Sequence, residues 1–258
     1  MKSSVQDALF ARVEALHQGL PWGQTLDAGT GEASLRWLLG LSPSVTAVTG
    51  DPWERDYLHG ALGASLHPPH RVVVGNWTDT TLLDGARFDV VVADYLLGAV
   101  ERFAPYFQDS LLARLRPHCA GRLYVLGQEP LPIPSDKPRE RHLKALFDLW
   151  YAGYILTGER PYREFPRRWV ERSLQASGYR VLHAESLPIV FRERFVTRRR
   201  DALLDLARRL PEPLGSAFAA RSQEATLAAL DACRADGGVR YGEDYLIAAA
   251  PDATSCNS

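Results

Sequence analysis

The sequence predicts an α/β protein whose mostly parallel sheet carries helices on both faces. Strand-like and helical stretches alternate throughout residues 24–127, and this alternation is typical of a parallel sheet. The stretch at residues 88–93, Phe-Asp-Val-Val-Val-Ala, is almost wholly apolar, as expected for a strand buried on both faces. Polar residues also end four of the strand-like segments, at residues 27, 51, 76–77 and 94–95. In parallel sheets such ends lie at the ligand-binding edge.

The elements of this core can be assigned in order. Apolar residues share one face of a helix over residues 5–17, and Pro21-Trp22-Gly23 ends it. A glycine turn then separates the first strand from the helix over residues 32–39. The remaining β-branched runs and amphipathic stretches complete the pattern. We expect strands at residues 24–27, 44–49, 71–74, 88–93 and 122–126, and further helices at 53–62 and 105–115.

The alternation weakens after residue 127. Four prolines between residues 128 and 138 indicate an extended connection. Helical periodicity resumes at 139–157 and at 166–177, where Gly178 supplies a stop. We then expect a strand at 179–186, helices at 195–210 and 214–235, a last strand at 245–250 and a frayed tail at 252–258. The predicted divisions are an N-terminal helix (1–20), a ligand-binding core (21–127), a helical insertion or lid (128–178) and a C-terminal strand pair (179–258) with a helical insertion (188–240).

Composition excludes several classes of protein. The formal net charge of −1 gives no general case for nucleic-acid binding. Three scattered cysteines do not form a disulfide framework or a zinc site. The polar start Lys2-Ser3-Ser4 does not resemble a signal peptide, and no apolar run approaches the roughly 20 residues of a membrane span. We therefore expect a cytoplasmic protein without a membrane segment.

The glycine turn Asp27-Ala28-Gly29-Thr30-Gly31 is the most informative motif. A helix N-terminus behind such a turn is suited to a nucleotide-like ligand. A dinucleotide fold would place a third glycine where Ser34 stands, and the Asp27 carboxylate would repel a pyrophosphate. That carboxylate instead favours a cofactor with a cationic amine, such as the amino-acid part of S-adenosylmethionine.

The next strand ends offer further cofactor contacts. Asp51, 24 residues beyond Asp27, is placed to bind ribose hydroxyls, and Asn76 and Trp77 suit the edge and the face of adenine. Each has a structural alternative that the sequence leaves open. Asp51 could only cap the following helix, Trp77 could be a core aromatic, and Asp94-Tyr95 could merely terminate the fourth strand.

This ordered set resembles the class I S-adenosylmethionine-dependent methyltransferases. The turn matches their first motif, D/E-x-G-x-G, with Ala33 at the third glycine position as a mild departure. The resemblance covers about residues 20–127 and the last strand pair. It implies a Rossmann-like, seven-stranded sheet whose last strand is antiparallel, and S-adenosylmethionine as the cofactor. The implied cofactor-binding residues are Asp27, Ala28, Gly29, Thr30, Gly31, Asp51, Asn76, Trp77, Asp94 and Tyr95.

The expected activity is methyl transfer to a small-molecule acceptor, aligned in line with the methyl–sulfur bond. Aromatic residues and arginines in the 128–165 insertion would suit a flat or anionic molecule, although they could equally form a buried helix face. The candidate acceptor contacts are Tyr95, Trp150, Tyr154, Tyr162 and Arg163. No catalytic base is assigned. The histidines show no metal-ligand spacing, so we expect no metal.

Two other functions stay open. Residues 159–200 contain eleven arginines against five glutamates, which would suit an RNA or protein methyltransferase. A noncatalytic adenosyl-binding scaffold is the third possibility. The 188–240 insertion could be a lid or the arm of a homodimer.

Overall fold

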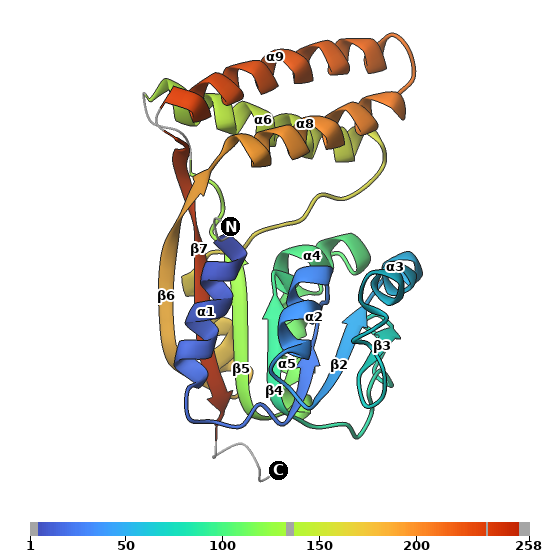
Figure 1. Cartoon of the computed structure of the whole chain (residues 1–258), viewed down its shortest axis with the longest axis vertical. Helices are drawn as coiled ribbons and strands as arrows, with labels where there is room; N and C mark the ends of the chain where they lie inside the picture. Colours follow the sequence, from blue (N-terminus) through green and yellow to red (C-terminus); the bar gives the residue numbers. More distant parts are fainter. Residues whose placement is uncertain (1–4, 133–136, 236, 253–258) are drawn as a thin grey trace. The chain divides into compact units, whose positions relative to one another are not determined.

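The computed structural model describes residues 5–132, 137–235 and 237–252. Its centre is one seven-stranded sheet in the order β3-β2-β1-β4-β5-β7-β6 (Figure 1). The predicted tail over 252–258 lies outside the described residues except for Asp252. The strands are β1 (Gln24–Asp27), β2 (Ser44–Thr49), β3 (Arg71–Val74), β4 (Phe88–Asp94), β5 (Cys119–Gln128), β6 (Tyr179–Phe191) and β7 (Val239–Pro251).

Strands β1 to β5 are parallel, and β7 runs antiparallel to β5. The register pairs Leu26 of β1 with Val91 of β4, and Gln128 of β5 with Asp244 of β7. Because β7 runs in the opposite direction, Asp244 and Tyr245 lie at the edge where the parallel strand β5 ends. The predicted mostly parallel sheet with an antiparallel last strand is thereby confirmed.

Helices cover both faces of the sheet, and Figure 1 shows α1 and α2 in front of it and α5 behind it. On the first face α1 and α2 bury leucines such as Leu9 and Leu35, and His17 of α1 bonds the Tyr124 hydroxyl of β5 at 2.9 Å. The helices beside the sheet are α1 (Val5–His17), α2 (Glu32–Leu39), α3 (Pro52–Leu62), α4 (Leu96–Phe103), α5 (Gln108–Leu115), a 3-10 turn (Arg116–His118) and α7 (Arg167–Ala176).

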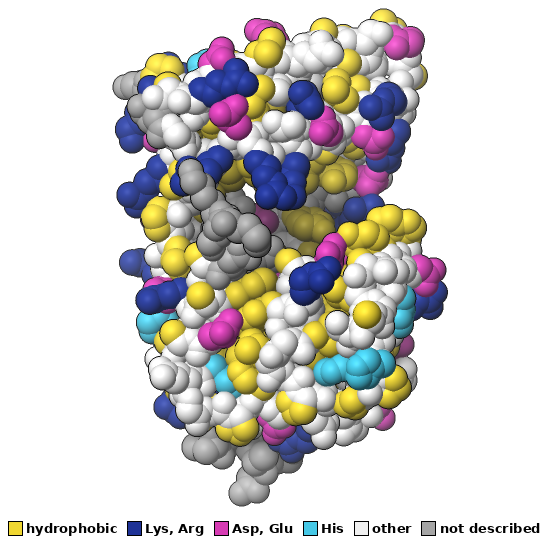
Figure 2. Space-filling model, in the orientation of Figure 1, with side chains coloured by type: hydrophobic (Ala, Val, Ile, Leu, Met, Phe, Trp, Pro, Cys, Tyr) yellow, Lys and Arg dark blue, Asp and Glu magenta, His cyan; other side chains and the backbone are white. Residues whose placement is uncertain are grey.

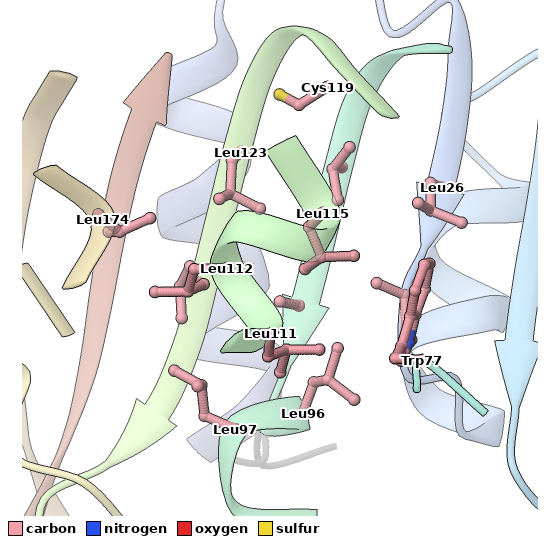
Figure 3. Close-up of a cluster of buried hydrophobic side chains, with 14 of the residues drawn as sticks. Leu26, Trp77, Leu96, Leu97, Leu111, Leu112, Leu115, Cys119, Leu123 and Leu174 are labelled. Atoms are coloured by element: carbon pink, nitrogen blue, oxygen red, sulfur yellow. The ribbon is translucent and has the colours of Figure 1, made fainter. Parts of the chain in front are cut away.

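On the second face α4, α5 and α7 pack against β1, β4, β5 and β7 in one buried cluster. Figure 3 shows leucines of α4 and α5 gathered against the strands in the same cluster as Leu123 of β5, with Trp77 below Leu26 of β1. Leu111, Leu115 and Leu123 are fully buried. Burial of a leucine side chain contributes roughly 1.5–3 kcal/mol to the stability of the fold. The packing on this face therefore stabilises the sheet whose strand ends carry the loops.

The chain divides into two compact units. Unit 1 comprises residues 1–129, 162–186 and 244–258, and unit 2 comprises 130–161 and 187–243. The helix α7, expected in an insertion over 128–178, belongs to unit 1, so of that range only residues 130–161 belong to unit 2. Unit 2 holds the helices α6 (Pro138–Leu156), α8 (Glu193–Arg208) and α9 (Leu214–Ala235) and the adjoining parts of β6 and β7.

The helices of unit 2 pack through apolar residues of all three, including Leu146, Leu206 and Phe218. Figure 2 shows basic and acidic side chains interspersed on the visible face of this unit. Several arginines of α8 and α9 are paired locally, as in Arg208–Asp205 and Arg234–Glu193. Within the described residues no helix combines the length and apolarity that a membrane crossing requires.

Four elements differ clearly from the sequence prediction. The helix α4 was not predicted, because it starts from Tyr95 in a left-handed conformation without a capping side chain. The predicted helix over 105–115 begins only at Gln108. Strands β6 and β7 are longer than expected, since Phe191 and Val239 extend them into unit 2.

Candidate functional site

A cavity of about 350 Å³ lies in unit 1 at the carboxyl ends of β1, β2, β3 and β4. Its volume falls within the usual range of small-molecule sites, roughly 300–1,000 Å³. The strand ends, the glycine turn and α4 supply its wall. The lining residues are Ala28, Gly29, Thr30, Gly31, Val48, Thr49, Gly50, Asp51, Glu54, Gly75, Asn76, Trp77, Asp94, Tyr95, Leu96, Ala99, Val100, Arg102, Phe103 and Tyr162.

The glycine turn forms one side of this cavity, and its two glycines serve different purposes. A Cβ on Gly29 would lie 2.6 Å from Cδ1 of Leu96, so this glycine permits close packing against α4. A Cβ on Gly31 would meet no atom within 4 Å, so the space beside Gly31 is open. Gly31 is also the N-cap of α2, and helix N-termini favour negatively polarised ligand groups.

Asp27 lies beneath the turn and does not line the cavity. It is fully buried, and Ser34 Oγ donates a 2.8 Å hydrogen bond to its Oδ2. Its Oδ1 has no hydrogen-bond partner. Burial raises the pKa of Asp27 to about 6, against the opposing effect of the Thr30 and Ser34 hydroxyls. Ser34, at the place of a third glycine, therefore holds the Asp27 carboxyl in position.

Asp51 lines the cavity at the end of β2 and is half-buried. Its Oδ1 accepts a 2.9 Å hydrogen bond from the backbone N–H of Trp53, which caps α3. The capping role and the position in the cavity wall therefore occur together in this residue.

Asn76 and Trp77 also line the cavity, but their polar atoms are bound within the protein. The Asn76 amide nitrogen donates to Phe103 O at 2.9 Å, and its Oδ1 accepts from Thr78. Trp77 is 4% exposed, and its Nε1 donates to Ala28 O at 2.7 Å. The Trp77 indole is thus a core side chain that also forms part of the wall.

The end of β4 places Asp94 and Tyr95 in the wall. Tyr95 has a φ of 50°, an uncommon conformation for a non-glycine residue. Its N–H donates to Leu126 O at 2.9 Å, and the Asp244 carboxylate lies near its hydroxyl. Burial and the neighbouring carboxylates raise the pKa of Tyr95.

Two acids that sequence reasoning missed stand beside Tyr95. Burial raises the pKa of Asp244 to about 6. Burial first, and then the charge of Asp244, raises the pKa of Glu164 to about 7. Their distance along the chain from residue 95 hides them, and only the antiparallel register of β7 brings Asp244 to this edge.

The candidate acceptor contacts fall in both units. Tyr162 lines the cavity, and Arg163 lies 3.6 Å from the Glu101 carboxylate. Trp150 and Tyr154 belong to unit 2, where the Arg199 guanidinium stacks 3.4 Å from the Trp150 ring centroid. In the part of the chain that the structure describes, no three His, Cys, Asp or Glu side chains are grouped to hold a metal ion.

No family model and no curated protein matches this sequence. Solved structures match it at low identity. The YcgJ protein of Bacillus subtilis has a TM-score of 0.61 and 12% identity, covering 95% of this chain and 98% of its own. Coclaurine N-methyltransferase, solved with N-methylheliamine and SAH, has a TM-score of 0.57 and 13% identity, covering 96% and 74%.

The [4+2]-cyclase SpnF matches with a TM-score of 0.57 and 18% identity, covering 97% of this chain and 84% of that chain. A cyclase and an N-methyltransferase therefore share this architecture, so fold alone does not select a reaction. The present chain has the Rossmann-like fold of the class I S-adenosylmethionine-dependent methyltransferases.

Proposed function

We propose that this chain binds S-adenosylmethionine and transfers its methyl group to a small-molecule acceptor. The observation that carries the proposal is the cavity at the carboxyl ends of β1 to β4, with the open space beside Gly31 on one side and Asp51 on another. In open α/β sheets this edge is where nucleotide-like ligands bind.

The residues present fit such a cofactor in three respects. The open space beside Gly31 can admit a ligand that a larger side chain would exclude. Asp51 supplies a carboxylate, which can accept hydrogen bonds from two ribose hydroxyls. Asp27 is a buried carboxylate beneath the turn, with an Oδ1 atom that has no hydrogen-bond partner, and its negative charge would attract a cationic amine bound in the cavity.

The side-chain N–H groups of Asn76 and Trp77 donate to backbone carbonyls of the protein. We therefore expect adenine to bind at the end of β3 through shape complementarity and apolar contacts, without hydrogen bonds from these donors. S-adenosylmethionine, when bound, supplies an electrophilic methyl group. The chain's own contribution is to bind, orient and shield the reactants, because alignment of the nucleophile provides much of the rate.

Binding of S-adenosylhomocysteine, measured by calorimetry, tests this proposal. We expect the wild type to bind it and not NADH. Asp51→Ala should weaken binding about 10- to 100-fold, because hydrogen bonds to a charged group contribute roughly 1.5–3 kcal/mol. Asp51→Asn removes the charge but keeps an oxygen that can cap α3. Comparing it with Asp51→Ala therefore distinguishes the loss of charge from the loss of the cap. Asp56→Ala, an exposed carboxylate of the same helix, is the control and should bind normally.

Equal affinity of the wild type and both Asp51 variants would contradict the assignment of the cavity. An RNA-directed activity receives less support, because several arginines of the 159–200 region are paired or stacked, including Arg167 with Glu171 and Arg199 with Trp150. A steep salt dependence of RNA binding would favour that alternative.

A further inference from the structure

Trp77, which lines the candidate cavity, is contacted by two basic side chains that do not line it. The Arg114 guanidinium of α5 lies over the Trp77 ring, 5.6 Å from its centroid. The His118 ring, at the end of the 3-10 turn, lies 5.9 Å from the Trp77 ring, with 56° between the two planes. The pair can therefore act on a bound ligand only through the residues that it holds in place.

Arg114 holds the segment that joins β3 to β4, residues 75–87. Its Nη2 lies within hydrogen-bond distance of three backbone carbonyl oxygens of that segment, those of Leu82 at 2.8 Å, Asp79 at 3.0 Å and Thr80 at 3.3 Å. Nη2 carries two protons, so one of them is shared between two carbonyls. Trp77 lies near the start of the same segment, and Arg114 therefore fixes the backbone that directly follows it.

His118 connects Arg114 to the far end of the segment. Its Nδ1 lies 2.8 Å from the carbonyl oxygen of Ala86, and its Nε2 lies 2.6 Å from Nη1 of Arg114. A carbonyl only accepts hydrogen bonds and a guanidinium only donates them, so Nδ1 carries the proton and Nε2 carries none. Both contacts are satisfied together only by a neutral His118 with its proton on Nδ1.

Protonation of His118 would break this arrangement. A second proton, on Nε2, would point at the donor Nη1 of Arg114 and would place two positive charges side by side. His118 is 3% exposed. Burial first, and then the charge of Arg114, lower the pKa of His118 below its ordinary value of 6.5. The Ala86 carbonyl and the Asp84 carboxylate oppose this shift. The hydrogen bonds are therefore intact at neutral pH and are lost when the imidazole is protonated in acid.

We propose that Arg114 and His118 form a clamp that positions Trp77 for the cofactor, and that cofactor binding requires His118 to be neutral. The inference rests on the proposed binding of S-adenosylmethionine. Trp77 also donates to Ala28 O at the start of the glycine turn, so a displaced Trp77 disturbs two sides of the cavity. Arg114 and His118 are positioning residues, because they act through Trp77.

Histidine nitrogen NMR of the whole chain tests the state of His118 without a ligand. His118→Gln identifies the His118 signals by their disappearance. We expect the tautomer with its proton on Nδ1 and a titration midpoint below 6.5. The opposite tautomer, a midpoint at or above 6.5, or the absence of any titration while the protein stays folded overturns the inference.

The indole N–H signal of Trp77, identified with Trp77→Phe, reports whether this titration reaches the cavity wall. Its shift with pH should include a part that follows the His118 midpoint, and that part should be absent from His118→Gln. Identical pH-dependent shifts in the wild type and His118→Gln would show that the clamp does not control Trp77.

His118→Gln also distinguishes the hydrogen bonds from the charge. Its amide can donate to Ala86 O and accept from Arg114, as the neutral imidazole does, but it gains no proton. We expect wild type and His118→Gln to bind S-adenosylhomocysteine equally at pH 7.5 in calorimetry. One pH unit below the His118 midpoint, about a tenth of the wild type keeps a neutral His118, so the wild type should bind about tenfold more weakly than His118→Gln. Asp27 is present in both proteins, so its own pH dependence cancels in this ratio.

Two further variants complete the comparison. His118→Phe can make neither hydrogen bond and should bind S-adenosylhomocysteine about tenfold more weakly than the wild type at pH 7.5. Circular dichroism establishes whether this variant folds, and if it does not, the ratio of wild type to His118→Gln decides alone. His142→Gln removes an exposed histidine of α6 and is the control, which should bind like the wild type at both pH values.

The same calorimetry distinguishes a failure of the clamp from a failure of the proposed function. If the wild type does not bind S-adenosylhomocysteine at pH 7.5, the cofactor assignment fails, and the role of the clamp in binding fails with it. If the wild type binds it at pH 7.5 and still matches His118→Gln below the His118 midpoint, the cofactor assignment stands and the clamp alone is wrong.

Discussion

The indole nitrogen of Trp77 donates a 2.7 Å hydrogen bond to the carbonyl oxygen of Ala28. This bond joins the segment after β3 to the residue that opens the glycine turn. Trp77 lies beside Leu26 in the core (Figure 3), so the two sides of the candidate cavity are held together by one buried side chain.

Replacing Trp77 with Phe should therefore destabilise the fold and weaken cofactor binding together. The change leaves the Ala28 carbonyl without its partner, at a cost of about 1–3 kcal/mol, and leaves unfilled space in the core. Urea unfolding and calorimetry with S-adenosylhomocysteine measure the two effects. Trp53→Phe is the control, because Trp53 is 67% exposed. An equal effect of the two substitutions would contradict the structural role of Trp77.

The two glycines of the turn should respond differently to substitution. Gly29→Ala forces Leu96 to move and should cost about 1–3 kcal/mol of stability. Gly31→Val should leave stability nearly unchanged, since its Cβ meets no atom within 4 Å, but should weaken S-adenosylhomocysteine binding by at least tenfold. Thermal unfolding and calorimetry on both variants check this contrast. Normal binding by Gly31→Val would show that the space beside Gly31 is not used.

Burial of Asp27 should make stability depend on pH. Its folded pKa of about 6 lies above the ordinary value of 3.8, so the folded state binds more protons between these values and the free energy of unfolding falls as pH rises from about 4 to 6. The contribution is of the order of 3 kcal/mol, since one pKa unit corresponds to about 1.4 kcal/mol. Asp27→Asn should remove this slope in urea titrations across pH. An unchanged slope in Asp27→Asn would contradict the assignment of this pH dependence to Asp27.

Cofactor binding should also depend on Asp27. A cationic amine favours the ionised carboxylate, so affinity for S-adenosylmethionine should rise as pH increases through about 6. Asp27→Asn should weaken binding and remove this rise, while an unfolding measurement confirms that the variant is folded. Calorimetry at pH 5 and pH 7.5 provides the comparison. The same rise in the variant would assign the dependence to another group.

In unit 2, the Arg199 guanidinium stacks on Trp150, and burial lowers the pKa of Arg199 to about 10. Its Nε is buried without a hydrogen-bond partner. Because unpaired buried donors are unfavourable, Arg199→Met should be neutral or stabilising. Trp150→Ala should instead destabilise unit 2, because the contacts of the indole with Arg199 and Tyr154 are lost. Chemical unfolding of both variants measures the difference, and equal losses would contradict this account.

The core was predictable because its signals are local. The alternation of strands and helices, the glycine turn and the polar strand ends all lie within residues 24–127, and each follows from a short stretch of sequence. The elements that the sequence did not predict correctly depend on tertiary structure. The helix α4 begins at Tyr95 without a cap, and the extra length of β6 and β7 comes from residues that continue into unit 2.

The sequence predicted which residues gather around the candidate cavity, but not how their polar atoms are bound. Nine of the ten cofactor candidates line the cavity, and the tenth, Asp27, lies buried beneath it. The sequence could not show that the polar atoms of Asn76 and Trp77 are occupied, because their partners Phe103 and Ala28 lie 27 and 49 residues away. Nor could it place Asp244 beside Tyr95, which depends on the register of an antiparallel strand.

A crystal structure of the protein with S-adenosylhomocysteine tests the central claim most directly. We predict that the ligand lies in the cavity of unit 1. Its ribose hydroxyls should be bonded to Asp51, its amino-acid part should lie beside Gly31, and its sulfur should lie on the side of Tyr95. Crystals that hold the ligand elsewhere, or a cavity that stays empty at saturating ligand, would contradict the assignment of this cavity as the cofactor site.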